Sequence, residues 1–328
     1  MGRIMKVSFV LGKFYPLHQG HISLIDFALS VSEKLIILVD NHESYLMSLE
    51  ERVKRIKETY PNVEVRGIQE STFQNPEESS EFWEYWKNIC EKYVPEEKEA
   101  IIGSMEYVFD LAKVLNIKPI VIDIEREGIN FSATRFRNDP KKEWKFLAPE
   151  SKKFLCKKIA IMGAESSGKS TLVKKLANNF DTNFVPEYGR TFAENLERPF
   201  QTEDFVEIAK FHDKHASVLA KHSNYYFFYD TEAITTLCWQ DFLVQQKSEE
   251  IENIIRNQKI DLYILVPVQD QWVNDGVRYQ KEKEERIIFY NKIKENLIRY
   301  NKNFIEIKNG SYTQVYEDVC EKIEELYE

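Results

Sequence analysis

The stretch "VSFVLGKFYPLHQGH", residues 7–21, joins a short apolar run to a turn that contains glycine, proline and two histidines. The run predicts a buried strand, and Gly12 and Pro16 predict the loop that follows it. His18 and His21 then lie three residues apart, a spacing that places them on one face of a helix. These two histidines are the first candidate functional residues of the chain.

Three interpretations of His18 and His21 are open. Zinc would need one or two further ligands nearby, and neither an HEXXH motif nor partner cysteines accompany the pair. A histidine packed in the core explains one of the two positions, but not a proline, a glycine and two histidines together. A helix N-terminus with two imidazoles around a transferring phosphate suits the location best.

Short β-rich runs alternate with helical patterns along the chain. The predicted strands are 6–12, 34–40, 63–68, 100–104 and 119–124 in the first half, and 157–163, 183–187, 225–230, 261–267 and 304–308 in the second. Between them lie segments such as "SLEERVKRIKETY", where Ser48 and Glu51 form a capping box and one face carries Leu49, Val53, Ile56 and Tyr60. This alternation predicts an α/β fold with parallel sheets, whose ligands bind beyond the carboxyl ends of the strands.

The length of 328 residues and a hydrophobic content of 43% suit two domains with separate cores. A lysine-rich, proline-containing stretch at 138–154 interrupts the alternation and predicts a boundary between domains at 1–145 and 155–328. The net charge of −9 argues against nucleic acid as a partner, because a nucleic-acid surface needs an excess of lysine and arginine.

The four cysteines have no CxxC spacing and predict neither a zinc site nor disulfides; they are Cys90, Cys156, Cys238 and Cys320. The N-terminus has no signal-peptide pattern, and no apolar segment reaches the roughly 18 residues of a membrane helix. We therefore expect a cytoplasmic protein with no membrane partner. The sequence leaves a homo-oligomer open.

The stretch "GAESSGKST", residues 163–171, follows a predicted strand and opens a helix. It satisfies the P-loop pattern GxxxxGK[ST] at Gly163, Gly168, Lys169 and Ser170. The glycines let backbone N–H groups face phosphates, Lys169 reaches the β- and γ-phosphates, and Ser170 ligates Mg²⁺. We therefore predict a nucleoside triphosphate site, which Ser166, Ser167 and Thr171 complete.

Two further predicted strands end in candidate site residues. Asp230 in "YYFFYDTE" is either a Walker-B acid that helps hold Mg²⁺ or a helix cap. In "VPEYGRTF", Glu187 and Arg190 are candidates to bind an acceptor hydroxyl and a phosphate, and Tyr188 to stack on a ring. Of the two carboxylates, we favour Asp230 over Glu187 as the base that accepts the hydroxyl proton.

The stretch "QDQWVNDGVRYQKEKEER", residues 269–286, follows a strand and has the composition of a lid. Arg278 or Arg286 in it is a candidate to stabilise a transferring phosphoryl group. The charge run at 282–286 is also typical of a solvated helix face.

The first stretch matches the pattern GxFxPxHxGH at Gly12, Phe14, Pro16, His18, Gly20 and His21. This pattern resembles the signature of nucleotidylyltransferases, the family that includes nicotinamide mononucleotide (NMN) adenylyltransferases. "FSATRFR", residues 131–137, resembles the second family signature, ISSTxIR, at Ser132, Thr134 and Arg137, and departs from it at Phe131 and Ala133. The resemblance implies that both segments bind ATP phosphates. Lys13 either adds a positive charge there or is a solvated loop lysine.

An adenylyltransferase signature followed by a P-loop and the segments "EYGR", "DTE" and "DGVR" resembles bifunctional proteins of the NadR type. The resemblance implies a Rossmann-like NMN adenylyltransferase domain followed by a P-loop ribosylnicotinamide kinase domain. It also implies ATP as co-substrate, Mg²⁺ as cofactor, and nicotinamide riboside, NMN and NAD as ligands. Matched positions in "GSMEY" and "DIER" imply nucleotide binding by Tyr107, Asp123 and Arg126. Trp83 and Trp86 either stack on nicotinamide or pack an amphipathic helix.

The expected function is NAD salvage by phosphorylation of nicotinamide riboside and adenylation of the resulting NMN. One alternative is a fused pantetheine-phosphate adenylyltransferase and dephospho-coenzyme A kinase, which shares both phosphate motifs. Another is a nucleotide-sensing regulator with little turnover. Since the first predicted strand begins near residue 5, we expect no helix-turn-helix before it and no repressor role.

Overall fold

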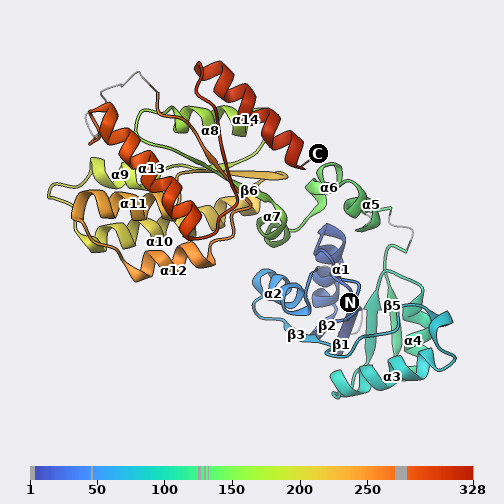
Figure 1. The fold of residues 1–328 in the computed structure, drawn as a ribbon. Helices are drawn as coiled ribbons and strands as arrows, with labels where there is room; N and C mark the ends of the chain where they lie inside the picture. Colours follow the sequence, from blue (N-terminus) through green and yellow to red (C-terminus); the bar gives the residue numbers. More distant parts are fainter. Residues whose placement is uncertain are drawn as a thin grey trace. The chain divides into compact units, whose positions relative to one another are not determined.

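The computed structural model describes residues 4–45, 47–124, 127–128, 131, 133–269 and 279–327. The chain divides into two compact units, Met1–Ser151 and Lys152–Glu328, and each is described by itself (Figure 1). The division lies inside the stretch 138–154 that interrupts the alternating pattern. Each unit contains one parallel five-stranded sheet, so the predicted α/β fold is confirmed.

The first sheet has the strand order β3-β2-β1-β4-β5. Its strands are β1 (Met5–Gly12), β2 (Ser32–Val39), β3 (Glu64–Gly67), β4 (Ala100–Gly103) and β5 (Lys118–Val121). Each predicted strand of this half is present. β1 is central and pairs in parallel with β2 on one side and β4 on the other. The motif that follows β1 therefore emerges at the middle of the sheet edge.

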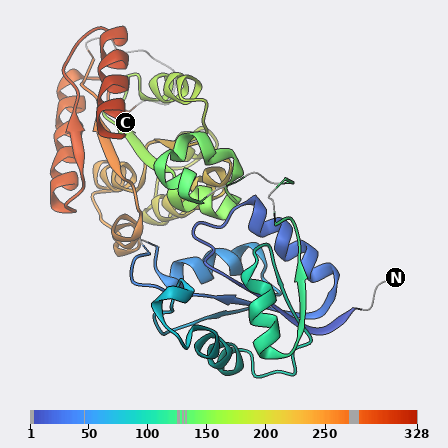
Figure 2. The ribbon, with the colours of Figure 1, turned by 90° about the vertical axis from the view of Figure 1, so that its right-hand side faces the viewer.

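Helices cover both faces of the first sheet because successive side chains of each strand point to opposite faces. Val10 packs with the helices α1 (Gln19–Ser30) and α2 (Leu49–Thr59), whereas Phe9 and Leu11 pack with α3 (Phe82–Tyr93) and α4 (Tyr107–Leu115). A 3-10 turn, Pro76–Glu78, precedes α3. Figure 2 shows these layers from a second direction.

The capping box predicted at the start of α2 is present. The Ser48 side chain accepts a hydrogen bond from the Glu51 amide, and the Glu51 side chain accepts one from the Ser48 amide. Leu49 and Ile56 are buried on the predicted face. The same helix also buries Arg52 and Arg55, which its amphipathic pattern does not predict.

The boundary stretch is folded. It begins where α5 (Ala133–Asn138) ends, and it forms α6 (Pro140–Glu143), the 3-10 turn Trp144–Phe146 and most of α7 (Pro149–Leu155). Trp144 and Leu147 are buried, and the Ala148 amide donates to the Leu17 carbonyl at 3.2 Å. Leu147 also forms an antiparallel bridge with His18. Apolar residues inside a polar, lysine-rich sequence thus attach most of this stretch to the first unit.

The second sheet has the order β10-β9-β6-β8-β7. Its strands are β6 (Lys157–Met162), β7 (Phe184–Val185), β8 (Tyr226–Asp230), β9 (Leu262–Leu265) and β10 (Phe304–Glu306), at the predicted places. The helices are α8 (Lys169–Asn179), α9 (Tyr188–Glu194), α10 (Thr202–Leu219), α11 (Ala233–Val244), α12 (Glu249–Asn257), α13 (Lys283–Arg299) and α14 (Tyr312–Tyr327), with a 3-10 turn at Ala220–His222. α8 and α14 pack on one face of the sheet, while α10 to α13 pack against one another on the other side (Figure 1). In the described part of the chain, no helix is long and apolar enough to cross a membrane.

Two candidate nucleotide sites

The histidines of the first unit stand where β1 gives way to α1. His18 is the N-cap residue, with extended backbone, and His21 lies in the first turn of the helix. Their ring centroids are 3.6 Å apart and the rings are stacked at 29°. A Cβ atom at Gly20 would lie 3.1 Å from the His18 ring, so only glycine leaves the ring in this position without a shift. Two imidazoles and a helix N-terminus therefore meet at one point, an arrangement suited to an anion.

The other signature residues position these rings. Phe14 is buried, has a left-handed backbone with φ of 47°, and packs its ring 4.8 Å from that of His21. A Cβ atom at Gly12 would lie 3.2 Å from the Phe14 ring. In the described part of the chain, no group of three or more His, Cys, Asp or Glu side chains could hold a metal ion. The arrangement favours the phosphate interpretation over the zinc interpretation.

The second signature of the first unit reaches the histidines through Phe131. The Phe131 ring lies 4.0 Å from that of His18 and is buried. Phe131 is one of the two departures from the family pattern, and its ring is tilted by 36° against that of His18. Arg137, in α5, is exposed and lies 6.0 Å from the Tyr15 ring. Thr134 is in the same helix, while Ser132 and Arg126 lie outside the described residues.

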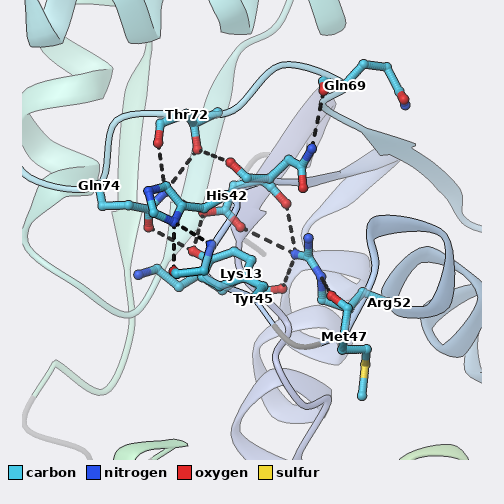
Figure 3. Close-up of polar contacts among 11 residues, drawn as sticks. Lys13, His42, Tyr45, Met47, Arg52, Gln69, Thr72 and Gln74 are labelled. Atoms are coloured by element: carbon cyan, nitrogen blue, oxygen red, sulfur yellow. Dashed lines mark hydrogen bonds and ion pairs between the residues drawn. The ribbon is translucent and has the colours of Figure 1, made fainter.

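A polar network around Arg52 holds the turn that follows β1, and no sequence motif predicted it (Figure 3). Arg52 is 1% exposed, and its Nη1 donates to the carbonyls of Lys13 and Asp40, each at 2.8 Å. Tyr45 donates to the Asp40 carboxylate at 3.1 Å, and its ring lies 4.9 Å from the Arg52 guanidinium. Gln74 completes the network around Asp40.

Burial dominates the electrostatics of this network. It raises the pKa of the Asp40 carboxyl, against the charges of Arg52 and Lys13, and it lowers the pKa of the Arg52 guanidinium. Arg52 is three residues from Leu49 and so borders the apolar face of α2. This position on the helix is the one feature of the sequence that indicates the burial of Arg52. Asp40, directly after β2, follows the rule that polar residues gather at carboxyl ends of strands.

The remaining predicted residues of the first unit have varied surroundings. The Tyr107 hydroxyl donates to the Leu11 carbonyl at 2.6 Å, which joins the start of α4 to the end of β1. Asp123 is exposed and accepts from the Gly128 amide. Trp86 is buried in a hydrophobic core of the first unit, which favours the packing alternative for this residue. Trp83 is half-buried and packs edge-on against Phe82.

The P-loop of the second unit has the shape its glycines predict. A Cβ atom at Gly163 would lie 2.9 Å from both Ser167 and Val266, and Gly168 has a φ of 81° immediately before α8. Lys169 Nζ donates to the Ala164 carbonyl at 2.7 Å, and Ser167 Oγ donates to the same oxygen at 2.8 Å. The loop thus curls around the start of α8, where its N–H groups can face a phosphate.

Two carboxylates stand beside the P-loop, as predicted. Asp230 ends β8, is buried, and shares a hydrogen bond with Ser170. Burial raises its pKa, against the opposing effects of Ser170 and Lys169. Glu187 follows β7, and burial together with the negative charge of Asp230 raises its pKa to about 7. Asp230 Oδ1 has no hydrogen-bond partner among the described residues. With the Ser170 hydroxyl it forms a set of oxygen donors that fits Mg²⁺.

A cavity of about 240 Å³ opens between the P-loop and α10 and α11. Its lining includes the polar side chains of Lys169, Glu187 and Arg190. It also includes three aromatic side chains, Phe200, Trp239 and Tyr279, which we call the aromatic wall. Tyr279 lies edge-on to both other aromatic rings, with centroids 6.2 Å from Trp239 and 6.4 Å from Phe200. Sequence reasoning missed this aromatic wall because its members come from three distant segments without a shared motif.

Two predictions for the second unit need correction, and one lies outside the described residues. Tyr188 packs edge-on against Phe211 and lines a separate hollow with Phe192. Arg286 is 3% exposed and donates to the Gln269 carbonyl, so it is neither a solvated residue nor free to reach a phosphoryl group. Its burial follows from its position on the inner face of α13. Arg278 is outside the described residues.

Comparisons with known proteins agree with this division. Residues 9–153 match the cytidylyltransferase-like family, and residues 158–314 match the AAA domain family. The chain is 30% identical over 352 residues to the trifunctional NAD biosynthesis/regulator protein NadR of Salmonella typhimurium, with 99% of this chain and 84% of that protein covered. The NadR protein of Escherichia coli is 29% identical over 348 residues, with 98% and 83% covered.

Solved structures show the same fold. The crystal structure of a NadR protein in complex with NR has a TM-score of 0.76 at 20% identity, over 99% of this chain and 96% of that one. Similarity to a phosphopantetheine adenylyltransferase of Wigglesworthia glossinidia brevipalpis, 41% identical, is limited to 66 residues, 19% of this chain and 39% of that protein. Fold and sites together define a nucleotide-dependent transferase with two phosphate-binding units. The chain belongs to the NadR family of NAD biosynthesis proteins.

Proposed function

We propose that the two units of this NAD biosynthesis enzyme carry out consecutive steps of salvage. The second unit phosphorylates nicotinamide riboside with ATP, and the first adenylates the resulting NMN to NAD. The observation that carries the kinase assignment is the single cavity that joins a P-loop to an aromatic wall. The pyridinium ring of nicotinamide riboside is a cation, and aromatic side chains attract cations through their faces.

In the kinase unit, ATP lies with its phosphates against the N–H groups of the P-loop and with Lys169 at the β- and γ-phosphates. The nicotinamide ring packs against Phe200, Trp239 and Tyr279. This orientation brings the 5′-hydroxyl of the riboside toward Glu187 and Arg190, which line the same cavity. The cavity therefore holds donor and acceptor in line for transfer of the γ-phosphoryl group.

The geometry favours Glu187 as the base, whereas the sequence favoured Asp230. Glu187 borders the cavity, while Asp230 is 3% exposed and engaged with Ser170. A raised pKa also suits Glu187 to accept a proton near neutral pH. Ser170 and Asp230 would hold Mg²⁺, which when bound neutralises the charge of the phosphates. Glu187 takes the hydroxyl proton as the new phosphate ester forms.

In the first unit, the phosphate of NMN attacks the α-phosphorus of ATP and pyrophosphate leaves. No covalent bond to the enzyme is needed, so catalysis consists of orientation and stabilisation of charge. His18 and His21 donate to the triphosphate at the N-terminus of α1. Lys13, Arg137 and the Ser132–Thr134 segment supply further positive charge and hydroxyl donors around it.

The alternative functions fit less well. Dephospho-coenzyme A, the substrate of the alternative kinase, has no permanently cationic ring for the aromatic wall to attract. The similarity to phosphopantetheine adenylyltransferase covers only 66 residues. A sensor with little turnover would not need the P-loop residue Lys169 together with both His18 and His21. We place the enzyme in the cytoplasm, where ATP is available and the four described cysteines stay free thiols.

The test is direct. The protein is incubated with ATP and Mg²⁺ together with nicotinamide riboside or dephospho-coenzyme A, and NMN, NAD and coenzyme A are followed by chromatography. We expect NMN to form first and NAD to follow, with no coenzyme A. Turnover of dephospho-coenzyme A alone would overturn the assignment, and tight NAD binding without product would favour the sensor.

A further inference from the structure

One residue of the P-loop, Glu165, has contacts that phosphate binding does not explain. Its carboxylate accepts hydrogen bonds from two consecutive backbone amides, Tyr279 at 3.0 Å and Gln280 at 2.7 Å. Its own amide donates to the Gln280 side chain at 3.2 Å. These bonds join segments that are more than a hundred residues apart in the chain. We call this group of contacts the Glu165 latch.

The Glu165 latch fixes one part of the aromatic wall. Gln280 is fully buried, so the backbone at this point is held in place. The Tyr279 ring lines the cavity and packs edge-on to Trp239 and Phe200. A single carboxylate therefore connects the loop that would hold the ATP phosphates to the ring that would hold the nucleoside.

The negative charge of Glu165 lets a bound triphosphate influence the position of Tyr279. Glu165 itself lines the cavity, so a bound triphosphate brings several negative charges close to its carboxylate. Like charges repel, most strongly where water is excluded. The repulsion favours conformations in which the carboxylate stays with the amides of Tyr279 and Gln280, because charged hydrogen bonds of this kind are strong. Conversely, a ring packed on Tyr279 keeps those amides in place to receive the carboxylate.

We propose that Glu165 is a positioning residue through which ATP and the nucleoside substrate bind cooperatively to the second unit. The inference rests on the proposed kinase function and adds a coupling between its two substrates. Because linkage is reciprocal, the nucleoside must increase the affinity for ATP by the same factor that ATP increases the affinity for the nucleoside.

Calorimetric titration of the full chain with nicotinamide riboside, with and without a non-hydrolysable ATP analogue and Mg²⁺, measures the coupling. For the natural protein we expect the analogue to tighten riboside binding by about tenfold. Glu165→Gln keeps an oxygen acceptor but removes the charge, so the ratio should fall to about one while riboside binding alone changes little. Glu165→Ala should also weaken binding of the riboside alone.

Glu284→Gln is the matched control, because Glu284 is an exposed glutamate near the start of α13 and should keep the tenfold ratio. In kinase assays, Glu165→Gln should raise the KM for riboside at saturating ATP with little change in kcat, a split that a general loss of folding does not produce. A ratio that is unchanged in both Glu165 variants overturns the inference alone. If the natural protein binds no riboside under either condition, the proposed kinase function and the inference both fail.

Discussion

The two units carry their phosphate motifs at the same place in their sheets but offer different atoms to a phosphate. In each, the strand that comes first in the chain is central, and the phosphate motif follows its carboxyl end. In the first unit the proposed donors are the side chains of His18 and His21, while in the second they are backbone N–H groups of the P-loop. Topology therefore fixes where a phosphate binds, and local sequence fixes which groups bind it.

The difference between backbone and side-chain donors determines how much packing each site needs to hold its donors in place. Backbone donors are positioned by two glycines and the helix start, so the P-loop needs little support beyond its own turn. Imidazole rings must be oriented by packing, and in the first unit Phe14 packs against His21 and Phe131 against His18. Arg52 holds the Lys13 carbonyl of the same turn. A side-chain site should therefore be more sensitive to changes in residues that never touch the ligand.

The largest effect is expected for Lys169→Ala. It removes the one P-loop cation that reaches the γ-phosphoryl group, so the rate of NMN formation should fall by about 10³-fold. Conversion of added NMN to NAD should be unchanged, because that site belongs to the other unit. Separate assays of the two half-reactions measure both. Loss of both activities would show that the sites are not independent.

His21→Ala should lower the conversion of NMN to NAD by about 10²-fold, since it removes one of two imidazole donors to the triphosphate. The kinase half-reaction serves as internal control and should keep its rate. His21→Phe would preserve packing against Phe14 without the donor. A His21→Phe variant as active as the natural protein would reduce His21 to a packing residue.

Arg52→Met tests the support beneath the first site. The variant leaves Asp40 and the Lys13 carbonyl in the interior without their donor, which should cost about 3–5 kcal/mol in the unfolding free energy of the first unit. Denaturant unfolding followed by the loss of adenylyl transfer measures it. Lys54→Met, on the exposed face of the same helix, should change stability by less than about 0.5 kcal/mol. Equal stability of the two variants would contradict a role for the buried network.

The pH dependence of the kinase step should reveal its base. A base works deprotonated, and the pKa of Glu187 is raised by burial and by Asp230, so activity is lost as pH falls through that raised pKa. We expect kcat/KM for nicotinamide riboside to fall about tenfold per pH unit below the break near neutral pH. A profile that stays flat down to pH 5, near the ordinary range of a carboxyl group, would remove Glu187 from this role.

The smallest effect is expected for Gly20→Ala. The added methyl group would lie 3.1 Å from the His18 ring, which must move by a few tenths of an ångström. Such a shift should lower adenylyl transfer by about tenfold with little loss of stability. Gly189→Ala, whose Cβ meets only ordinary contacts, should leave that reaction unchanged. Equal rates for both variants would show that His18 tolerates displacement.

The ten strands and both phosphate motifs could be predicted because each depends on a local pattern. The apolar run before Gly12 predicts β1, and the spacing of Gly163 and Gly168 predicts the turn they form. Side chains that depend on distant partners escaped prediction. From its sequence position alone Arg52 would be predicted to be a solvated helix residue. Its burial depends on the carbonyls of Lys13 and Asp40, which come from other segments of the chain. The prediction for Arg286 failed for the reverse reason, because its burial keeps it from reaching a phosphoryl group.

The bridge between His18 and Leu147 bears on how this chain can be divided. A fragment that ends at residue 145 keeps each sequence motif of the first site, yet it lacks Leu147, which pairs with His18, and Ala148, which donates to the Leu17 carbonyl. A fragment that ends at residue 151 keeps both. We therefore expect a fragment that keeps the first site intact to extend past the backbone partner of His18, a few residues beyond the last recognisable motif.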